Sequence, residues 1–221
     1  SGVPTSSNNV TLSSGSSITI TVDVAANTNS LTINSSNVTL SVSAGQSITA
    51  AGNLNISAGT LNLLNLGAAF PAVTGSVNLT GGTVGYTGAG AQTVSTQSYA
   101  GLNLAGSGAK TIAGTTNIAG DVTIGGTATA TTAGSTIVFN GSGAQAVAAT
   151  TYNNLTINGS GTKTLAAGSQ ADTVNGSFAL TAGTLDVSTQ TLVLNGSVSQ
   201  TSGVLTSQLT GTVNYNQGSG G

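Results

Sequence analysis

Two lysines and four aspartates are the charged side chains of this chain, which has no arginine, glutamate or histidine. Lys110 and Lys163 occupy equivalent positions of a sequence repeat. A lysine that attacks a nearby asparagine, with an aspartate as proton shuttle, would form an isopeptide crosslink. No aspartate has a spacing that identifies it as that shuttle. We therefore expect both lysines to be solvated side chains at turns.

The aspartates are candidates for a calcium site or for a pectate-lyase-like catalytic site. Calcium takes about six to eight oxygen ligands, usually including clustered carboxylates. The four carboxylates here are isolated in sequence, and Asp121 and Asp172 lie at roughly equivalent repeat positions. We expect turn residues, with no metal, no cofactor and no catalytic role, at Asp23, Asp121, Asp172 and Asp186.

Aromatic residues recur at two repeat positions. Tyr86, Phe139 and Tyr215 share one position, and Tyr99 and Tyr152 share the other. An exposed aromatic row would bind sugar rings, whereas buried aromatics would stack in the core or between layers of the fold. Because aromatic residues make up only 3% of the chain, we expect core or stacking positions.

Asparagine supplies the candidate modification sites. Asn-x-Ser/Thr sequences mark potential N-glycosylation sites, although a chain rich in Asn, Ser and Thr produces many of them by chance. The candidates are Asn9, Asn34, Asn37, Asn55, Asn78, Asn140, Asn154, Asn158, Asn175 and Asn195.

Composition excludes several classes of function. Charged residues make up 3% of the chain, against about a quarter in ordinary soluble domains. Without His or Cys, the usual nucleophile–base pairs and transition-metal sites cannot be built. A net charge of −2 with two cations does not suit a nucleic acid or an anionic membrane surface. No run of about 18 apolar residues is present. We expect a non-enzyme with no nucleic-acid partner and no membrane insertion.

The pattern along the chain predicts strands. Gly, Ser, Thr and Asn are poor in helix interiors, and apolar residues alternate with polar ones at the strand period. Gly, Asn and Ser clusters between these segments indicate turns. The alternating segments start at Val10, Ile18, Leu31, Val38, Leu54, Val77, Leu102, Val122, Leu155, Phe178 and Leu192.

The spacing of these segments indicates stacked coils. Positions 10, 31, 54, 77 and 102 are separated by 21, 23, 23 and 25 residues, which is typical of a β-solenoid. We expect about nine to ten coils. The interval from 122 to 155 does not fit one coil and contains another strand, Ile137–Phe139. In such ladders each side chain lies above its counterpart, so Asn, Ser and Thr can form hydrogen-bonded rows where like charges would repel.

A longer repeat has an offset of 53 residues. Residues 84–114 and 137–167 are identical at 13 of 31 aligned positions. We divide the single solenoid of residues 1–221 into N-terminal coils (1–82), repeat 1 (83–135), repeat 2 with insertions (136–211) and the start of a third repeat (212–221). No polar cap follows Tyr215, so we expect the last coil either to pair with another subunit or to continue in a longer chain.

The repeat motif resembles bacterial surface proteins. It consists of Gly-x-Gly-Ala-Gln, then Tyr-x-x-Leu, then Gly-Ser-Gly-x-Lys-Thr, at 88–111 and 141–164. This pattern is similar to β-strand-repeat adhesins and fibre proteins of autotransporter and filamentous-haemagglutinin type. The resemblance implies a right-handed parallel β-helix, an extracellular or cell-surface location such as a biofilm matrix, and no catalytic residues.

We expect a structural subunit of an extracellular filament or surface coat that polymerises with itself, head to tail, through its strand edges. One alternative is an adhesin repeat that binds glycans, ice or another surface. Thr127-Ala-Thr129-Ala-Thr131 resembles the threonine arrays of ice-binding solenoids, but it is one short stretch without a repeated threonine face. The alternative fold is a row of antiparallel β-sandwich domains of the pilin type.

Overall fold

The computed structural model describes residues 3–168 and 171–216, apart from the side chain of Thr131. Among these residues every regular element is a β-strand, and the strands pair in parallel. They stack as a β-solenoid of about ten turns. The predicted fold is confirmed, and the alternative of antiparallel sandwich domains is excluded.

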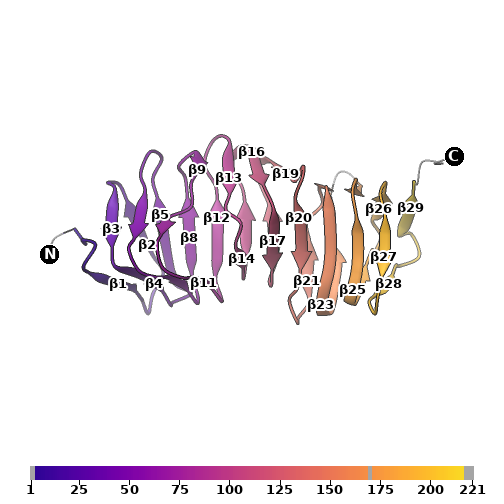
Figure 1. Cartoon of the computed structure of the whole chain (residues 1–221), viewed down its shortest axis with the longest axis horizontal. Coiled ribbons are helices and arrows are strands. Elements are labelled where there is room, and N and C mark those ends of the chain that lie inside the picture. Colours follow the sequence, from indigo (N-terminus) through magenta and orange to yellow (C-terminus); the bar gives the residue numbers. More distant parts are fainter. Residues whose placement is uncertain (1–2, 169–170, 217–221) are drawn as a thin grey trace. The chain divides into compact units, whose positions relative to one another are not determined.

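The chain divides into two compact units, and the first comprises residues 1–110 and 125–129. Its strands from successive coils lie side by side (Figure 1). The first sheet contains β1 (Asn9–Leu12), β4 (Ser30–Ile33), β7 (Leu54–Ile56) and β11 (Val77–Leu79). The second contains β2 (Ile18–Val22), β5 (Val38–Val42), β8 (Thr60–Leu63), β12 (Thr83–Tyr86) and β15 (Leu102–Leu104). The third side is formed by β3 (Ala26–Thr28), β6 (Ile48–Ala50) and β10 (Ala72–Val73), and by β9 (Gly67–Ala68) with β13 (Gln92–Val94).

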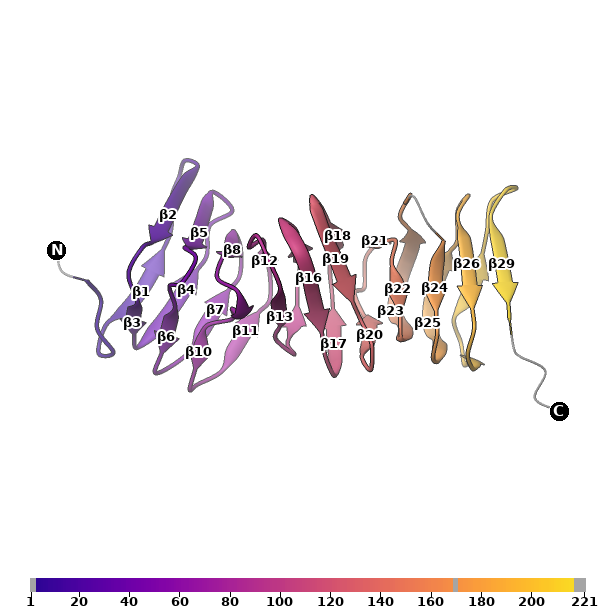
Figure 2. The same cartoon turned by 90° about the horizontal axis from the view of Figure 1, so that it is seen from above.

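The second unit comprises residues 111–124 and 130–221. Figure 2 shows β22, β24, β26 and β29 of this unit in succession. One sheet contains β17 (Thr115–Ile118), β20 (Thr136–Phe139), β23 (Asn154–Leu165), β25 (Phe178–Asp186) and β27 (Val198–Gln200), with β21 (Gln145–Val147) on β23 and β28 (Val204–Thr206) on β25. The other contains β22 (Thr151–Tyr152), β24 (Asp172–Val174), β26 (Thr191–Leu194) and β29 (Thr212–Tyr215). The strands not yet named, which come from both units, are β14 (Ser98–Tyr99), β16 (Ser107–Ile112), β18 (Val122–Ile124) and β19 (Thr127–Thr131).

The core of each unit consists of ladders of aliphatic side chains. On β5 and β8, for example, Leu40 pairs with Leu61 and Val42 with Leu63, and all four are at most 3% exposed. Each such side chain contributes about 1.5–3 kcal/mol on burial. Because successive side chains of a strand point to opposite faces, the intervening Thr, Ser and Asn residues are turned away from the core.

The strand pattern also accounts for the interval that does not fit one coil. β18, β19, β20, β21 and β22 fill the span from 122 to 155. The expected repeat boundaries at 83, 136 and 212 coincide with the first residues of β12, β20 and β29. Residues 217–221 of the expected third repeat lie outside the described residues.

Candidate functional site

Lys110 is the centre of a buried cluster in the first unit. Its side chain is 0% exposed, and its ammonium donates hydrogen bonds to the backbone carbonyls of Gly88 and Gly90, both at 2.8 Å, and of Ser107 at 2.9 Å. The expectation of a solvated lysine at a turn is wrong here. A lysine carries three donor hydrogens, and the three carbonyls satisfy all of them.

Lys163 forms the equivalent cluster in the second unit. It is also 0% exposed, and it donates to the carbonyls of Gly141 at 2.6 Å, Gly143 at 3.2 Å and Gly161 at 3.2 Å. The expected solvation is therefore wrong for this residue too. We call the two arrangements, centred on Lys110 and Lys163, the lysine clusters.

A glutamine completes each lysine cluster. Gln92 accepts from the N–H of Gly88 at 2.9 Å and donates to two backbone carbonyls of the preceding coil. Gln145 accepts from the N–H of Gly141 at 2.9 Å and likewise donates to two carbonyls. Sequence reasoning missed these two residues. The available signal was that a glutamine precedes the lysine by 18 residues in both repeats (110 − 92 and 163 − 145).

Glycine is required around the lysine clusters because the coils approach closely. A Cβ atom at Gly159 would overlap the carbonyl oxygen of Gly141, and one at Gly161 would overlap that of Gly143. Gly108 in the first unit also has a positive φ of 73°, which residues other than glycine rarely adopt. The Gly-x-Gly segments of the repeat are therefore the coil corners that bring carbonyls to the lysine.

Burial lowers the pKa of both lysine ammonium groups. The backbone carbonyls oppose this effect because their dipoles favour the charged form. The acceptors are peptide carbonyls, which supply neither the side-chain amide nor the carboxyl that an isopeptide crosslink joins. The arrangement can hold an ammonium and bind two coils together.

The aspartates do not converge on one another. Asp172 is 1% exposed in β24, accepts from the N–H of Thr150 at 3.2 Å, and has its pKa raised to about 7 by burial. The prediction of a turn residue is therefore wrong for Asp172. Asp121 accepts from the N–H of Ala146 at 2.8 Å. Within residues 3–168 and 171–216, no group of three metal-ligating side chains is present.

Tyr86 and Tyr99 form a closed hydrogen-bond triangle with Ser95 in the first unit. Tyr99 donates to the carbonyl of Ser95 at 2.6 Å, and the N–H of Ser95 donates to the Tyr86 hydroxyl at 2.9 Å. The two hydroxyls are 3.0 Å apart, and since the Tyr99 hydrogen is already used, Tyr86 donates to Tyr99. Burial raises the pKa of Tyr86 to about 12 and that of Tyr99 further, so both stay protonated.

The second unit has the equivalent aromatic pair with only one of these hydrogen bonds. Tyr152 is 3% exposed and donates to the carbonyl of Ala148 at 2.6 Å, and Phe139, which lacks a hydroxyl, is 0% exposed. Four of the five recurrent aromatics are therefore core residues, as expected. Tyr215 is 53% exposed on β29, although its ladder partner Leu194 is 4% exposed, and its stacking stays a prediction.

The candidate glycosylation sites lie on the outside of the coils. Asn37, Asn55 and Asn154 are half-buried, and the other seven are exposed. Several of them form the predicted polar rows: Asn78 donates to Asn55 at 2.8 Å, and Asn195 donates to Asn175 at 2.8 Å. These amide groups stabilise coil stacking, and their modification stays a prediction.

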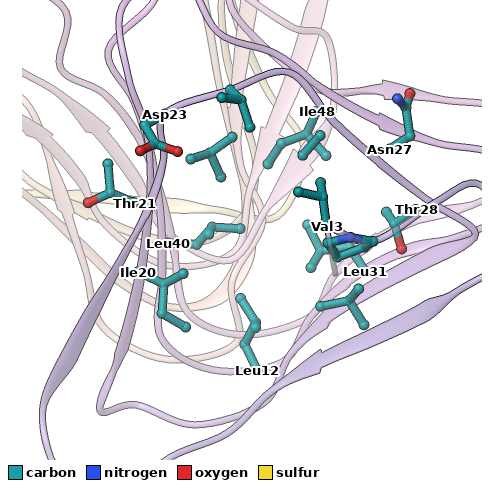
Figure 3. Close-up of a pocket in the computed structure, with 15 residues that line it drawn as sticks. Val3, Leu12, Ile20, Thr21, Asp23, Asn27, Thr28, Leu31, Leu40 and Ile48 are labelled. Atoms are coloured by element: carbon teal, nitrogen blue, oxygen red, sulfur yellow. The ribbon is translucent and has the colours of Figure 1, made fainter. Parts of the chain in front are cut away.

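The first coil exposes an apolar cavity of about 260 Å³. Figure 3 shows Leu12, Ile20, Leu31, Leu40 and Ile48 directed toward this common space, with Val3 beside them. The apolar residues of β4 and β5 are fully buried, whereas Ile18 of β2 is 44% exposed. The interior side chains of the first coil are therefore only partly covered.

The last described coil has the same property. Val198 is 44% exposed although its ladder partner Phe178 is 2% exposed. Val213 is 38% exposed although its partner Leu192 is 0% exposed. β27, β28 and β29 each pair with a strand on one side only. This coil therefore presents three strand edges and the apolar side chains between them.

Comparison with known proteins gives no relative: no family model, no curated protein and no solved structure matches this chain. Among the described residues, no helix is long and apolar enough to cross a membrane.

Proposed function

We propose that this protein is a structural subunit of an extracellular filament or surface coat, and that its subunits stack head to tail. The observation that carries the proposal is that interior side chains are exposed on both terminal coils. Side chains that are buried one coil further in, at Phe178 and Leu192, have counterparts on β27 and β29 that are more than a third exposed.

The two coil surfaces suit each other. β1, β2 and β3 are edge strands of the first unit, and β27, β28 and β29 are edge strands of the second. A parallel strand pair has a different edge on each side, so these surfaces are complementary rather than identical. Asp23 is the charged side chain at the rim of the first coil, so charge does little to oppose contact. Stacking in chain order, with β1 on β27, continues the pairing already present between coils.

Engineered cysteines test this contact because the natural chain contains none. Thr11 lies between the inward-facing residues of β1, and Ser199 is the middle residue of β27; both side chains are exposed. If β1 stacks on β27, these two positions are neighbours at a strand spacing of ~4.8 Å, within the Cα range of a disulfide. The variants are Thr11→Cys, Ser199→Cys and the double variant, oxidised at equal concentration.

The proposal predicts dimers only when the two single variants are mixed, and a ladder of oligomers for the double variant. Negative-stain electron microscopy of the unmodified protein should show uniform filaments. Dimers of Thr11→Cys alone would indicate head-to-head contact, and monomers in every sample together with isolated particles would refute polymerisation.

The proposed role needs no catalytic group, cofactor or nucleic acid, and its location at the cell surface or in a matrix belongs to the same proposal. Binding of glycans by an adhesin repeat is the weaker candidate. The aromatic side chains that would contact sugar rings are buried in four of the five recurrent positions, which removes the row of exposed rings that such binding requires.

A further inference from the structure

Four threonines form a row across the second sheet of the first unit. Thr19 pairs with Thr39, Thr39 with Thr60, and Thr60 with Thr83, on β2, β5, β8 and β12. Their apolar neighbours along each strand point into the core: Leu40, Leu61 and Val84 are at most 3% exposed. Because side chains alternate between faces, the four threonines lie on the outer face.

The row belongs to a two-dimensional array. Thr21 and Ser41 lie two residues further along β2 and β5 and pair with each other. Adjacent strands are ~4.8 Å apart, and residues i and i+2 of a strand are about 6.7 Å apart. On β2 and β5 the hydroxyls of Thr19, Thr21, Thr39 and Ser41 therefore lie on a rectangle of roughly these dimensions. On β8 and β12 the second line continues with Asn62 and Gly85.

These hydroxyls have no protein partners, on one exposed threonine, Thr19, and three half-buried ones. Within the part of the chain that the structure describes, the hydroxyls of Thr19, Thr39, Thr60 and Thr83 make no hydrogen bond to protein. The first sheet differs, because its outward amides bond to one another, as Asn78 does to Asn55 at 2.8 Å. The four threonine hydroxyls of β2, β5, β8 and β12 therefore keep their hydrogen-bonding capacity for an external partner, whereas Asn62 of β8 accepts from the Thr87 hydroxyl.

The face is also rigid and almost uncharged. Threonine is β-branched, so its χ1 angle is restricted, and the strands beneath are fixed by the packed core. The array itself contains no charged residue type; Asp23 follows Thr21 by two residues, and Lys110 of the same unit is fully buried. A rigid neutral hydroxyl array loses little entropy when it orders a layer of water.

We propose that this threonine face binds ice. Its hydroxyls hold water oxygens at a spacing close to the oxygen repeat on the prism faces of ice, and the threonine methyl groups fill the spaces between those waters. The inference is independent of head-to-tail stacking, because it uses the outer face of the second sheet rather than the strand edges and interior side chains of the first coil. Thr127–Thr131, where the sequence pattern suggested such chemistry, lies on β19 and not in this row.

The test uses a variant that destroys flatness and a matched control. Thr39→Tyr with Thr60→Tyr places two rings in the middle of the array, while Thr49→Tyr places one ring on an exposed position of β6 in a different sheet. Circular dichroism and melting temperature establish that each variant is folded. The protein is then partitioned into slowly grown ice, and thermal hysteresis is measured.

The proposal predicts enrichment of the wild type and of Thr49→Tyr in the ice fraction, and loss of that enrichment in the double variant. A Thr39→Val and Thr60→Val variant, which keeps shape but removes two hydroxyls, should lose part of it. Wild-type protein that stays in the liquid like an unrelated soluble protein would overturn the inference, as would equal partitioning of wild type and double variant. Binding to powdered cellulose or chitin but not to ice would also overturn it.

Discussion

Replacement of Lys110 by methionine tests the central packing feature of the first unit. Methionine keeps most of the volume of the lysine stem but removes the ammonium, so the carbonyls of Gly88, Gly90 and Ser107 lose their common donor. Hydrogen bonds to charged groups contribute about 1.5–3 kcal/mol each, roughly 5 kcal/mol or more for three. Relief from burying a charge recovers several kcal/mol. We expect a net loss of about 2–4 kcal/mol.

The assay is urea and thermal unfolding followed by circular dichroism. For a chain of this size each kcal/mol lowers the melting temperature by about 2–4 °C, so Lys110→Met should melt roughly 5–15 °C below the wild type. Thr111→Ala, at the exposed neighbouring position, is the control and should change stability by less than ~0.5 kcal/mol. Lys163→Met should reproduce the loss, and the double variant should show the sum within ~0.5 kcal/mol.

A Lys110→Met variant as stable as Thr111→Ala would refute this reasoning. It would mean that the free-energy cost of desolvating the ammonium equals the free energy gained from its three hydrogen bonds to carbonyls. A loss for Lys110 but not for Lys163 would instead show that the two lysine clusters are not energetically equivalent, despite their common hydrogen bonds.

Substitutions at three other buried positions should also change the stability of the protein. Asp172 has a pKa of about 7 in the folded state against 3.8 unfolded, so its contribution to the free energy of unfolding should be complete below about pH 4 and decline as pH rises to about 7. This decline is worth ~4 kcal/mol before solvent screening and about 2 kcal/mol after it. Asp172→Asn should remove the decline in urea midpoints measured from pH 4 to 8. Thr116 is fully buried with a hydroxyl that has no partner among the described residues, so Thr116→Val should stabilise by about 1 kcal/mol, and an unchanged or lower urea midpoint would contradict this. Gly159→Ala should destabilise by at least ~2 kcal/mol, because its Cβ would overlap the carbonyl oxygen of Gly141; a wild-type melting temperature would show that the corner can open without cost.

The fold was predictable because alternation and spacing are properties of the sequence itself. Segments such as Ile18–Val22 and Val38–Val42 form strands at the expected residues, and their apolar positions face the core. The prediction worked because coil stacking repeats one local rule, so that local preference and global structure agree.

The lysine clusters were not predictable in the same way. A lysine in a chain of low charge ordinarily points to solvent, and nothing in the residues around Lys110 marks it as buried. Its acceptors are peptide carbonyls, which every residue has, and only the geometry of the glycine corners aims them at one point. The threonine row escaped detection for a related reason: Thr19, Thr39 and Thr60 become neighbours through strand register.

The lysine clusters also affect how the protein responds to dissolved salt. In most proteins buried cations face carboxylates, and at the surface such pairs weaken as ionic strength rises. Here each ammonium is held by neutral peptide dipoles out of contact with solvent, and the polar rows between coils are amides. Dissolved ions therefore screen these ammonium–carbonyl and amide–amide hydrogen bonds only weakly. These contacts would be equally strong in fresh water, in sea water and in brine, which agrees with the extracellular role proposed above.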